Sequence, residues 1–226
     1  MKRIALIHTV GSVYASFETQ LRSVLGEEVL IHNILDDFLA TNPIEVGSFT
    51  KTNVERLRCD IQSAVLTGCD VVVTSCSTLS PAVERLKGEF STPIITIDDA
   101  MASKAVEAGS SLVVLATAHS TVEPTLEKLR RTAKEQGKAI SVEAFVCTEA
   151  IAALRRGDKE EHDRLVLELS HKAVHADVCV LAQASMAHME EPIHQLLHIP
   201  VFSSPRLCME QVAAFLKCLD NVGDDR

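Results

Sequence analysis

Two stretches of this sequence repeat the same order of residue types at a fixed offset. Asp70–Leu79 (DVVVTSCSTL) and Asp177–Met186 (DVCVLAQASM) each open with an aspartate and three apolar residues, and they begin 107 residues apart, at 70 and 177. In both, a proline that opens a short apolar run follows 17 residues after the seventh position, from 76 to 93 and from 183 to 200. This matched spacing favours two duplicated halves. The alternative is the strand–helix–strand order that all α/β proteins share.

Short apolar, β-branched runs alternate with helical patterns along the whole chain. The pattern predicts strands at 4–7, 29–35, 71–74, 93–97, 112–116, 142–146, 178–181 and 200–202. It predicts helices at 17–25, 50–66, 81–86, 122–136, 164–176 and 206–219, with Ser80 as the N-cap of the third. Such alternation is typical of an α/β fold with parallel sheets covered by helices on both faces.

The duplication divides the predicted fold into two pseudo-symmetric lobes. We expect one lobe from 1–97 plus 205–226, closed by the last helix, and the other from 98–204. Ligands of parallel sheets sit beyond the carboxyl ends of the strands. The ends of the paired strands should therefore converge on a cleft between the lobes, with Cys76 and Gln183 as pseudo-symmetric partners across it.

Composition excludes several classes of partner. The net charge is −9 with no basic cluster, which argues against nucleic acid and against an anionic membrane surface. Hydrophobic residues make up 46% of the chain, but aromatic residues only 4%, so the core should be aliphatic. The seven cysteines form no CxxC pair, and the histidines show no metal-ligand spacing, so we expect no metal site and no thioredoxin-like redox pair. We expect a soluble, cytoplasmic protein with reduced thiols.

Cys76 is the strongest chemical candidate, because it follows a predicted strand and precedes a helix whose start would favour a thiolate. Cys147 also follows a strand, although a buried structural cysteine is the simpler interpretation. His188 comes five residues after Gln183, where either an acid–base group or a solvated loop histidine fits.

Three segments carry a resemblance to a known family. Val71–Thr78, Leu115–Thr121 and Val180–Met186 are similar to segments of the aspartate/glutamate/hydantoin racemase superfamily, whose members use no cofactor. Members typically carry one cysteine after the analogous strand of each half, and the two thiols flank the acidic carbon of the substrate. One removes a proton, and the other returns a proton to the opposite face. This chain departs from that pattern, because Gln183 stands at the second cysteine position and a carboxamide does not titrate.

The resemblance implies a racemase-like isomerase independent of pyridoxal phosphate, in which Cys76 activates the carbon next to a carboxylate or a ureide carbonyl. The predicted catalytic pair is Cys76 and Gln183, and Cys147 or His188 would replace the missing proton carrier. The substrate-binding residues that it implies are His8, Ser77, Thr78, Thr117, His119, Ser120, Thr121, Ala184 and Ser185.

Two other functions stay open. One is a single-cysteine decarboxylase or lyase of the malonate type, and the other is a non-catalytic protein that binds small carboxylates. The substrate would be a small carboxylate or a hydantoin-like molecule, and relatives lead us to expect a homodimer or a larger homo-oligomer.

Overall fold

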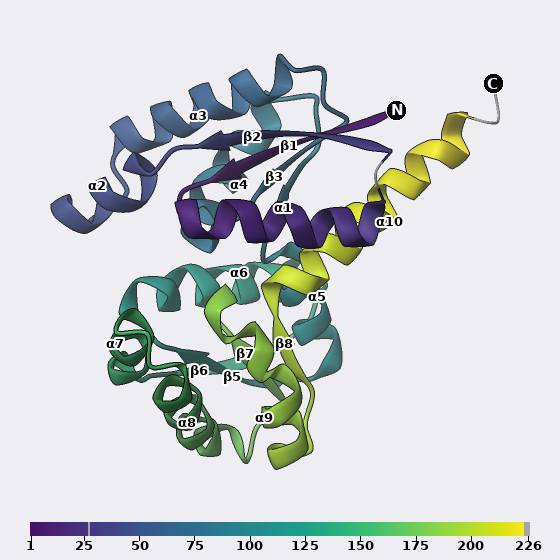
Figure 1. The fold of residues 1–226 in the computed structure, drawn as a ribbon. Helices are drawn as coiled ribbons and strands as arrows, with labels where there is room; N and C mark the ends of the chain where they lie inside the picture. The colour runs from purple at the N-terminus through teal and green to yellow at the C-terminus, as the bar shows by residue number, and fades with distance from the viewer. Residues whose placement is uncertain (27, 224–226) are drawn as a thin grey trace. The chain divides into compact units, whose positions relative to one another are not determined.

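The chain forms two compact units, each built on its own parallel sheet. The computed structural model describes residues 1–26 and 28–223, and it divides the chain into Met1–Ile97 with Cys208–Arg226, and Asp98–Leu207. The sheet of the first unit has the strand order β2-β1-β3-β4, and that of the second has the order β6-β5-β7-β8 (Figure 1). The two orders are equivalent, as a duplicated half requires.

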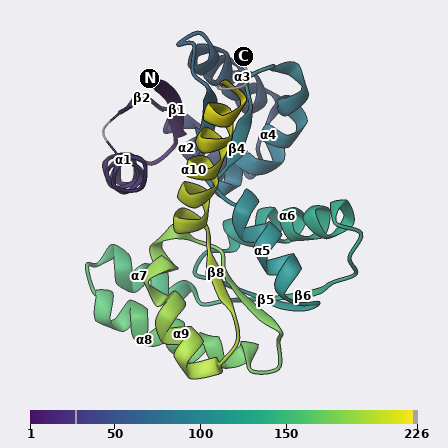
Figure 2. The ribbon, with the colours of Figure 1, turned by 90° about the vertical axis from the view of Figure 1, so that its right-hand side faces the viewer.

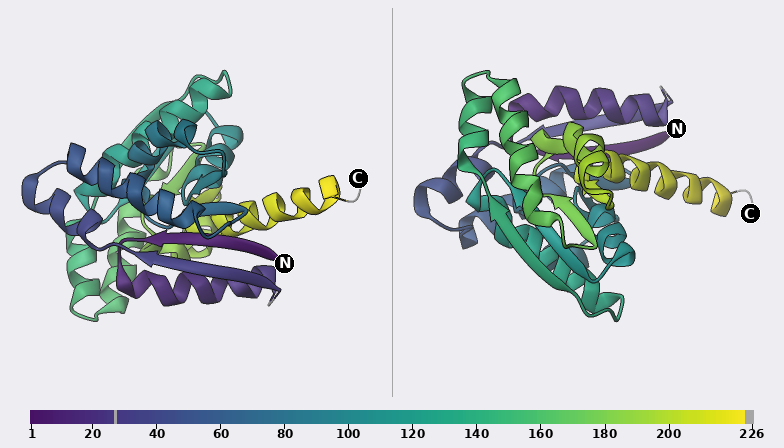
Figure 3. Two further views of the ribbon diagram at one scale, coloured as in Figure 1. Left: turned by 90° about the horizontal axis from the view of Figure 1, so that it is seen from above. Right: turned by 90° about the horizontal axis from the view of Figure 1, so that it is seen from below.

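In the first unit, helices cover both faces of the sheet. Its elements are β1 (Lys2–His8), α1 (Gly11–Leu25), β2 (Val29–Leu35), α2 (Phe38–Val46), α3 (Lys51–Val65), β3 (Val71–Thr74), α4 (Ser80–Leu86), β4 (Ile94–Thr96) and, from Cys208 on, α10 (Ser204–Gly223). Alternate residues of β1 point to opposite faces. Ile4 and Leu6 pack with α1 and α10, whereas Ala5 and Ile7 pack with α2, α3 and α4 (Figures 1 and 3).

The second unit repeats this layering. Its elements are α5 (Asp99–Ala108), β5 (Ser111–Ala116), α6 (Val122–Glu135), β6 (Ser141–Val146), α7 (Thr148–Arg155), α8 (Lys159–Ser170), β7 (Val178–Leu181), α9 (Glu190–Leu197) and β8 (Val201–Ser203). Val114 packs with α5 and α6 on one face, and Leu115 packs with α7, α8 and α9 on the other (Figure 2). The inner strands β1 and β5 are buried on both faces of their sheets, which explains why their sequences are continuous apolar runs.

The duplicated sequence positions make equivalent backbone hydrogen bonds. The amide of Val72 donates to the carbonyl of Pro93, and the amide of Cys179 donates to the carbonyl of Pro200, both at 2.9 Å. The two prolines found by their spacing therefore sit at the same register position in their sheets. This equivalence is what a duplication predicts, down to single hydrogen bonds.

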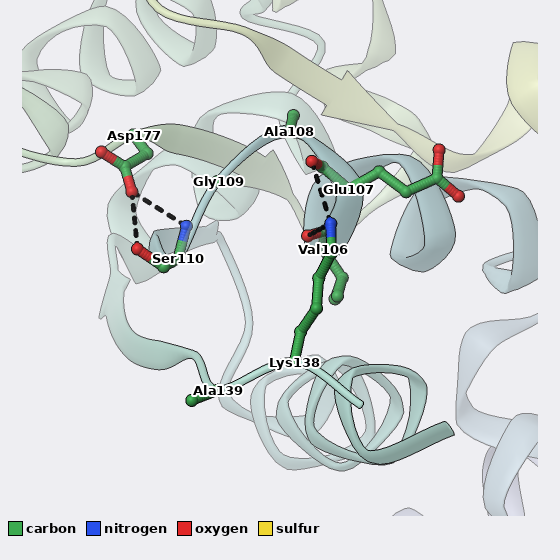
Figure 4. A pocket seen from close by; sticks show the side chains of 8 residues that line it. All are labelled: Val106, Glu107, Ala108, Gly109, Ser110, Lys138, Ala139 and Asp177. Atoms are coloured by element: carbon green, nitrogen blue, oxygen red, sulfur yellow. Dashed lines mark hydrogen bonds between the residues drawn. The ribbon is translucent and has the colours of Figure 1, made fainter. Parts of the chain in front are cut away.

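The aspartate that opens each repeat caps the amino end of a neighbouring strand. Asp70 accepts a hydrogen bond from the amide of Arg3 at 2.7 Å, at the start of β1. Asp177 accepts from the amide of Ser110 at 2.9 Å (Figure 4) and from the amide of Ser111 at 2.8 Å, at the start of β5. These hydrogen bonds lower the pKa of Asp177, since they favour its ionised form.

Figure 4 shows that an open depression of the second unit lies at this amino end. Its polar side chains are those of Asp177, Glu107, Ser110 and Lys138. Lys138 donates to the carbonyl groups of Val106 and Glu107 at 3.0 and 3.1 Å. A side chain on Gly109 would overlap the Cβ of Asp177, so the backbone approaches closely here. The polar groups bind the protein itself, and the depression lies away from the carboxyl ends of the strands.

Several helix boundaries differ from the sequence prediction. Ser80 is not an N-cap, because a 3₁₀ turn (Ser77–Leu79) continues directly into α4, so Ser80 is already helical and Leu79 takes the capping position. Helix α1 begins at Gly11 and α8 at Lys159, both earlier than predicted. The sequence reading also lacked α2, α5, α7 and α9. Among the helices of residues 1–26 and 28–223, none is both long and apolar enough to cross a membrane.

Candidate active site

The predicted site residues gather at the carboxyl edge of each sheet. Because all neighbouring strands are parallel, their carboxyl ends share one edge. In the first unit this edge carries His8, Ser75 and Cys76. In the second unit it carries Thr117, Cys147 and Gln183.

Cys76 lies between the end of β3 and the 3₁₀ turn that follows it. Its backbone is extended, with φ −125° and ψ 118°, and its carbonyl accepts a hydrogen bond from the amide of Leu79 at 3.1 Å. The side chain is half-buried, and its Sγ shares a hydrogen bond with Oγ1 of Thr78 at 3.0 Å. The thiol is therefore both held by a neighbour and reachable from solvent, which sets it apart from the buried Cys69, Cys179 and Cys208.

His8 supports the residue next to Cys76 from inside the fold. The amide nitrogen of Asn33 donates to Glu18 at 2.6 Å, so its oxygen must accept from Nε2 of His8 at 3.1 Å. Nδ1 of His8 is then the acceptor for the hydroxyl group of Ser75 at 2.7 Å. Burial lowers the pKa of His8 and outweighs the opposing effects of Asn33 and Glu18.

A neutral His8 thus fixes Ser75, and with it the backbone that leads to Cys76. The side chain is fully buried, and the protein itself uses both ring nitrogens. The sequence predicts contact between His8 and a ligand, and that contact stays a prediction.

Gln183 occupies the equivalent position in the second unit. It lies between β7 and the 3₁₀ helix Ala184–Met189, with φ −136° and ψ 142°, close to the backbone conformation of Cys76. Its carboxamide makes a double hydrogen bond with Thr117: the Thr117 amide donates to Oε1 at 2.7 Å, and Nε2 donates to Oγ1 at 2.9 Å. Thr117 is fully buried. Gln183 therefore ties the end of β7 to the end of β5.

The other predicted binding residues differ in exposure. His119, Ser120 and Ala184 are exposed, and Ser77, Thr78, Thr121 and Ser185 are half-buried. The hydroxyl group of Thr121 donates to the carbonyl of Ala118 at 3.0 Å, which closes the 3₁₀ turn His119–Thr121.

Cys147 is half-buried and takes the N-cap position of α7. Its amide bonds to the carbonyl of Ala116 at 2.9 Å, which places it beside the end of β5. Its Sγ donates to a carboxylate oxygen of Glu149 at 3.6 Å. The pKa of Glu149 is lowered, first by its own backbone N–H and then by Cys147.

The structure also brings together three residues that the sequence spacing did not connect. Nδ1 of His162 and Nε2 of His188 each lie 2.7 Å from the same carboxylate oxygen of Asp163. Burial acts to raise the pKa of Asp163, but hydrogen bonds from the two histidines outweigh it and lower the pKa. His162 and Asp163 are adjacent in sequence, yet His188 is far along the chain, so only the packing of α8 against the 3₁₀ helix Ala184–Met189 reveals the cluster.

A carboxylate pair in the first unit is a separate polar feature. Burial, followed by a hydrogen bond and repulsion from Asp36, raises the pKa of Asp60 to about 7, while Arg56 opposes the shift. Arg56 forms an ion pair with the buried Asp36, whose carboxylate lies beside Asp60.

Known structures with the same fold cover almost the whole chain. Allantoin racemase from Klebsiella pneumoniae matches with a TM-score of 0.65 and 17% sequence identity, over 96% of this chain and 89% of that protein. Aspartate racemase from Picrophilus torridus matches with a TM-score of 0.64 and 18% identity, over 96% and 94%. Glutamate racemase from Thermus thermophilus matches with a TM-score of 0.67 and 18% identity, over 97% and 82%. At these identities the likeness establishes the fold.

Sequence comparison gives a family assignment. Among curated proteins, none matches the chain significantly. The family model Asp/Glu/Hydantoin racemase matches residues 8–212, which include both repeats and every predicted site residue. The chain belongs to the Asp/Glu/hydantoin racemase family.

Proposed function

We propose that this protein is a racemase-like isomerase that activates the carbon next to a carboxylate or a ureide carbonyl through the thiolate of Cys76, without a cofactor. The observation that carries the proposal is the setting of Cys76. It is half-buried, follows a strand at the carboxyl edge of its sheet, and is held by Thr78. Membership of a racemase family supports the reaction type, and the family name supports small carboxylates and hydantoin-like molecules as substrates.

In the proposed first step, the thiolate of Cys76 removes the acidic proton of the substrate. The C–H bond breaks, an S–H bond forms, and the electron pair stays on carbon, delocalised into the adjacent carbonyl group. His8 and Ser75 keep the backbone at Cys76 in place, so the sulfur does not have to reorganise when charge moves. The backbone N–H groups of Ser77 and Thr78 are the proposed partners of the substrate carboxylate.

Inversion then needs a proton from the opposite face of the carbanion. Gln183 cannot supply it, since its carboxamide does not titrate and is already bonded to Thr117. Cys147 and His188 stay the proposed replacements, and each lies against a carboxylate, Glu149 or Asp163.

The two hydrogen bonds between Gln183 and Thr117 also favour a second candidate, a single-cysteine decarboxylase. There the C–C bond to a carboxylate breaks, carbon dioxide leaves, and the S–H group of Cys76 protonates the carbanion. Only one proton donor is needed, and a fixed, neutral carboxamide at position 183 fits such a one-sided reaction. The two candidates differ in whether a second proton carrier works opposite Cys76.

Proton exchange distinguishes these functions. The protein is incubated in deuterated water with single enantiomers of amino acids and hydantoins and with malonates, and each mixture is followed by NMR and chiral chromatography. Exchange of the acidic proton with loss of optical purity supports the isomerase, whereas carbon dioxide release from malonates supports the decarboxylase. Cys76→Ala should abolish either activity.

Two cysteine variants serve as controls. Cys59→Ala removes an exposed thiol, and Cys69→Ala removes a buried one. Both should keep the activity of the unmodified chain. Comparable losses in all three variants would overturn the assignment of Cys76. If the unmodified chain acts on none of the amino acids, hydantoins and malonates, the result would favour a non-catalytic protein that binds carboxylates.

A further inference from the structure

We propose that His162, Asp163 and His188 form a binding site for a divalent metal ion of the zinc class. One nitrogen of each histidine and one carboxylate oxygen lie within 4.8 Å of one another. The three ligands come from two elements, α8 and the 3₁₀ helix Ala184–Met189. This inference assigns His188 to the metal, which leaves Cys147 as the proposed proton carrier opposite Cys76.

The donor set suits this class of metal. Imidazole nitrogen and carboxylate oxygen are ordinary zinc ligands, and two histidines with one carboxylate leave positions open for water. The two imidazole rings are stacked, with an angle of 28° between them and centroids 6.0 Å apart. Each nitrogen is 2.7 Å from the shared oxygen of Asp163.

Coordination requires all three pairs of ligand atoms to reach new separations. Zinc lies about 2.0–2.2 Å from such ligands, so two ligand atoms of a tetrahedral site are about 3.3 Å apart. The two N–O contacts must therefore lengthen by about 0.6 Å, and the two histidine nitrogens, which lie within 4.8 Å of each other, must reach the same separation. The ring protons that now join the histidines to Asp163 give way to the metal, and binding becomes stronger as the pH rises.

The exposure of the ligands is graded in a way that suits entry of an ion. The side chain of His162 is fully buried, that of Asp163 is 27% exposed and that of His188 is 37% exposed. A fixed inner ligand thus stands behind two ligands that solvent reaches. When Nδ1 of His162 binds the metal, its proton sits on Nε2, a buried atom with no hydrogen-bond partner among the described residues. We therefore expect micromolar rather than nanomolar affinity.

Metal binding would connect this cluster to the loop of Gln183. His188 belongs to the 3₁₀ helix that begins directly after Gln183, and Asp163 belongs to α8. A bound ion cross-links the two elements and restricts the backbone that carries the carboxamide. The chemistry at the carboxyl edge of the second sheet would then respond to metal.

The test measures zinc binding directly. Chelator-treated protein is titrated with Zn²⁺ by calorimetry, and Co²⁺ is then used as a spectroscopic probe of the ligands. We expect one site, a tetrahedral Co²⁺ spectrum without thiolate charge-transfer bands, and at least a tenfold weaker affinity in His188→Ala and in Asp163→Asn. His175→Ala removes another exposed histidine outside the cluster and should bind as the parent does.

Three results would overturn the proposal. One is no binding at Zn²⁺ concentrations up to 100-fold above the protein. Another is equal affinity in the parent, His188→Ala and Asp163→Asn. The third is a Co²⁺ spectrum dominated by thiolate ligands. Circular dichroism of each variant establishes that it is folded, and His188→Ala alters an exposed side chain, so its fold should persist.

Discussion

The paired hydrogen bonds between Gln183 and Thr117 give a stability prediction that the structure makes quantitative. Gln183→Ala removes both bonds and leaves the amide of the fully buried Thr117 without its acceptor. A net hydrogen bond contributes about 0.5–1.5 kcal/mol, and an unsatisfied buried donor costs about 1–3 kcal/mol. Because Gln183 is only half-buried, water can partly replace its oxygen. We expect a loss of about 2 kcal/mol in the free energy of unfolding, measured with urea and circular dichroism.

A double-mutant cycle isolates the side-chain part of this interaction. Thr117→Val removes only the hydroxyl acceptor of Nε2, so it should cost about 1 kcal/mol in the parent. In the Gln183→Ala background the same change should cost almost nothing, which gives a coupling energy of about 1 kcal/mol. Gln195→Ala, which removes an exposed glutamine of α9, should stay within about 0.5 kcal/mol of the parent. An equal cost of Thr117→Val in both backgrounds would refute the pairing.

Three further changes test other features. Gly109→Ala should destabilise the chain by about 1–3 kcal/mol in urea unfolding, because the new Cβ overlaps Asp177. In the control Gly88→Ala the new Cβ meets no atom within 4 Å, so this change should not destabilise the chain. Equal effects of the two changes would contradict the close approach of the backbone at Gly109. Asp60 has a pKa of about 7 in the folded chain, above its ordinary value of 3.8, so its contribution to stability is complete below pH 3.8 and is lost as the pH rises through about 7. Asp60→Asn should therefore weaken the fall in the free energy of unfolding between about pH 4 and 7. An unchanged slope in that range would show that another group causes the fall. Gln183→Cys restores a titratable group and should increase the loss of optical purity per exchanged proton in the NMR assay. If the variant retains the substrate's configuration as the parent does, position 183 does not face the reacting carbon.

Much of the fold could be predicted from sequence because buried parallel strands have continuous apolar sequences. The bounds predicted for the strands Val71–Thr74 and Val178–Leu181 agree with the structure to the residue. The resemblance to the racemase family rests on the segments around them and on Leu115–Thr121, and the family model matches residues 8–212. The duplication was visible because strand, proline and aspartate recur at one spacing. Those residues make equivalent hydrogen bonds in the two units, so the spacing reflects shared geometry.

The helices that escaped prediction are short or carry mixed signals. Helix α2 contains Pro43, which normally marks a loop, and α7 and α9 have only eight residues each. Helix α5 buries Met101, Ala102, Ala105 and Val106, a spacing that does indicate a helix face. Small alanine side chains weaken that signal in a hydropathy pattern.

The candidate site was predictable only in part, because sequence shows which residues follow strands but not what their side chains contact. Cys76 and Gln183 were found by position. The hidden network behind His8, the anchoring of Gln183 and the meeting of His162 with His188 depend on packing between distant segments. Sequence spacing carries no signal for such contacts.

The closing role of α10 has a consequence for how the chain is made. The face of the first sheet that carries Ile4 and Leu6 is covered partly by Met209 and Val212, which leave the ribosome long after β1. The unit Asp98–Leu207 is continuous in sequence and can complete its core earlier. The core of the amino-terminal unit therefore stays incomplete until α10 has been synthesised, and the second unit can fold before it. This reverses the usual order, in which the domain synthesised first also folds first.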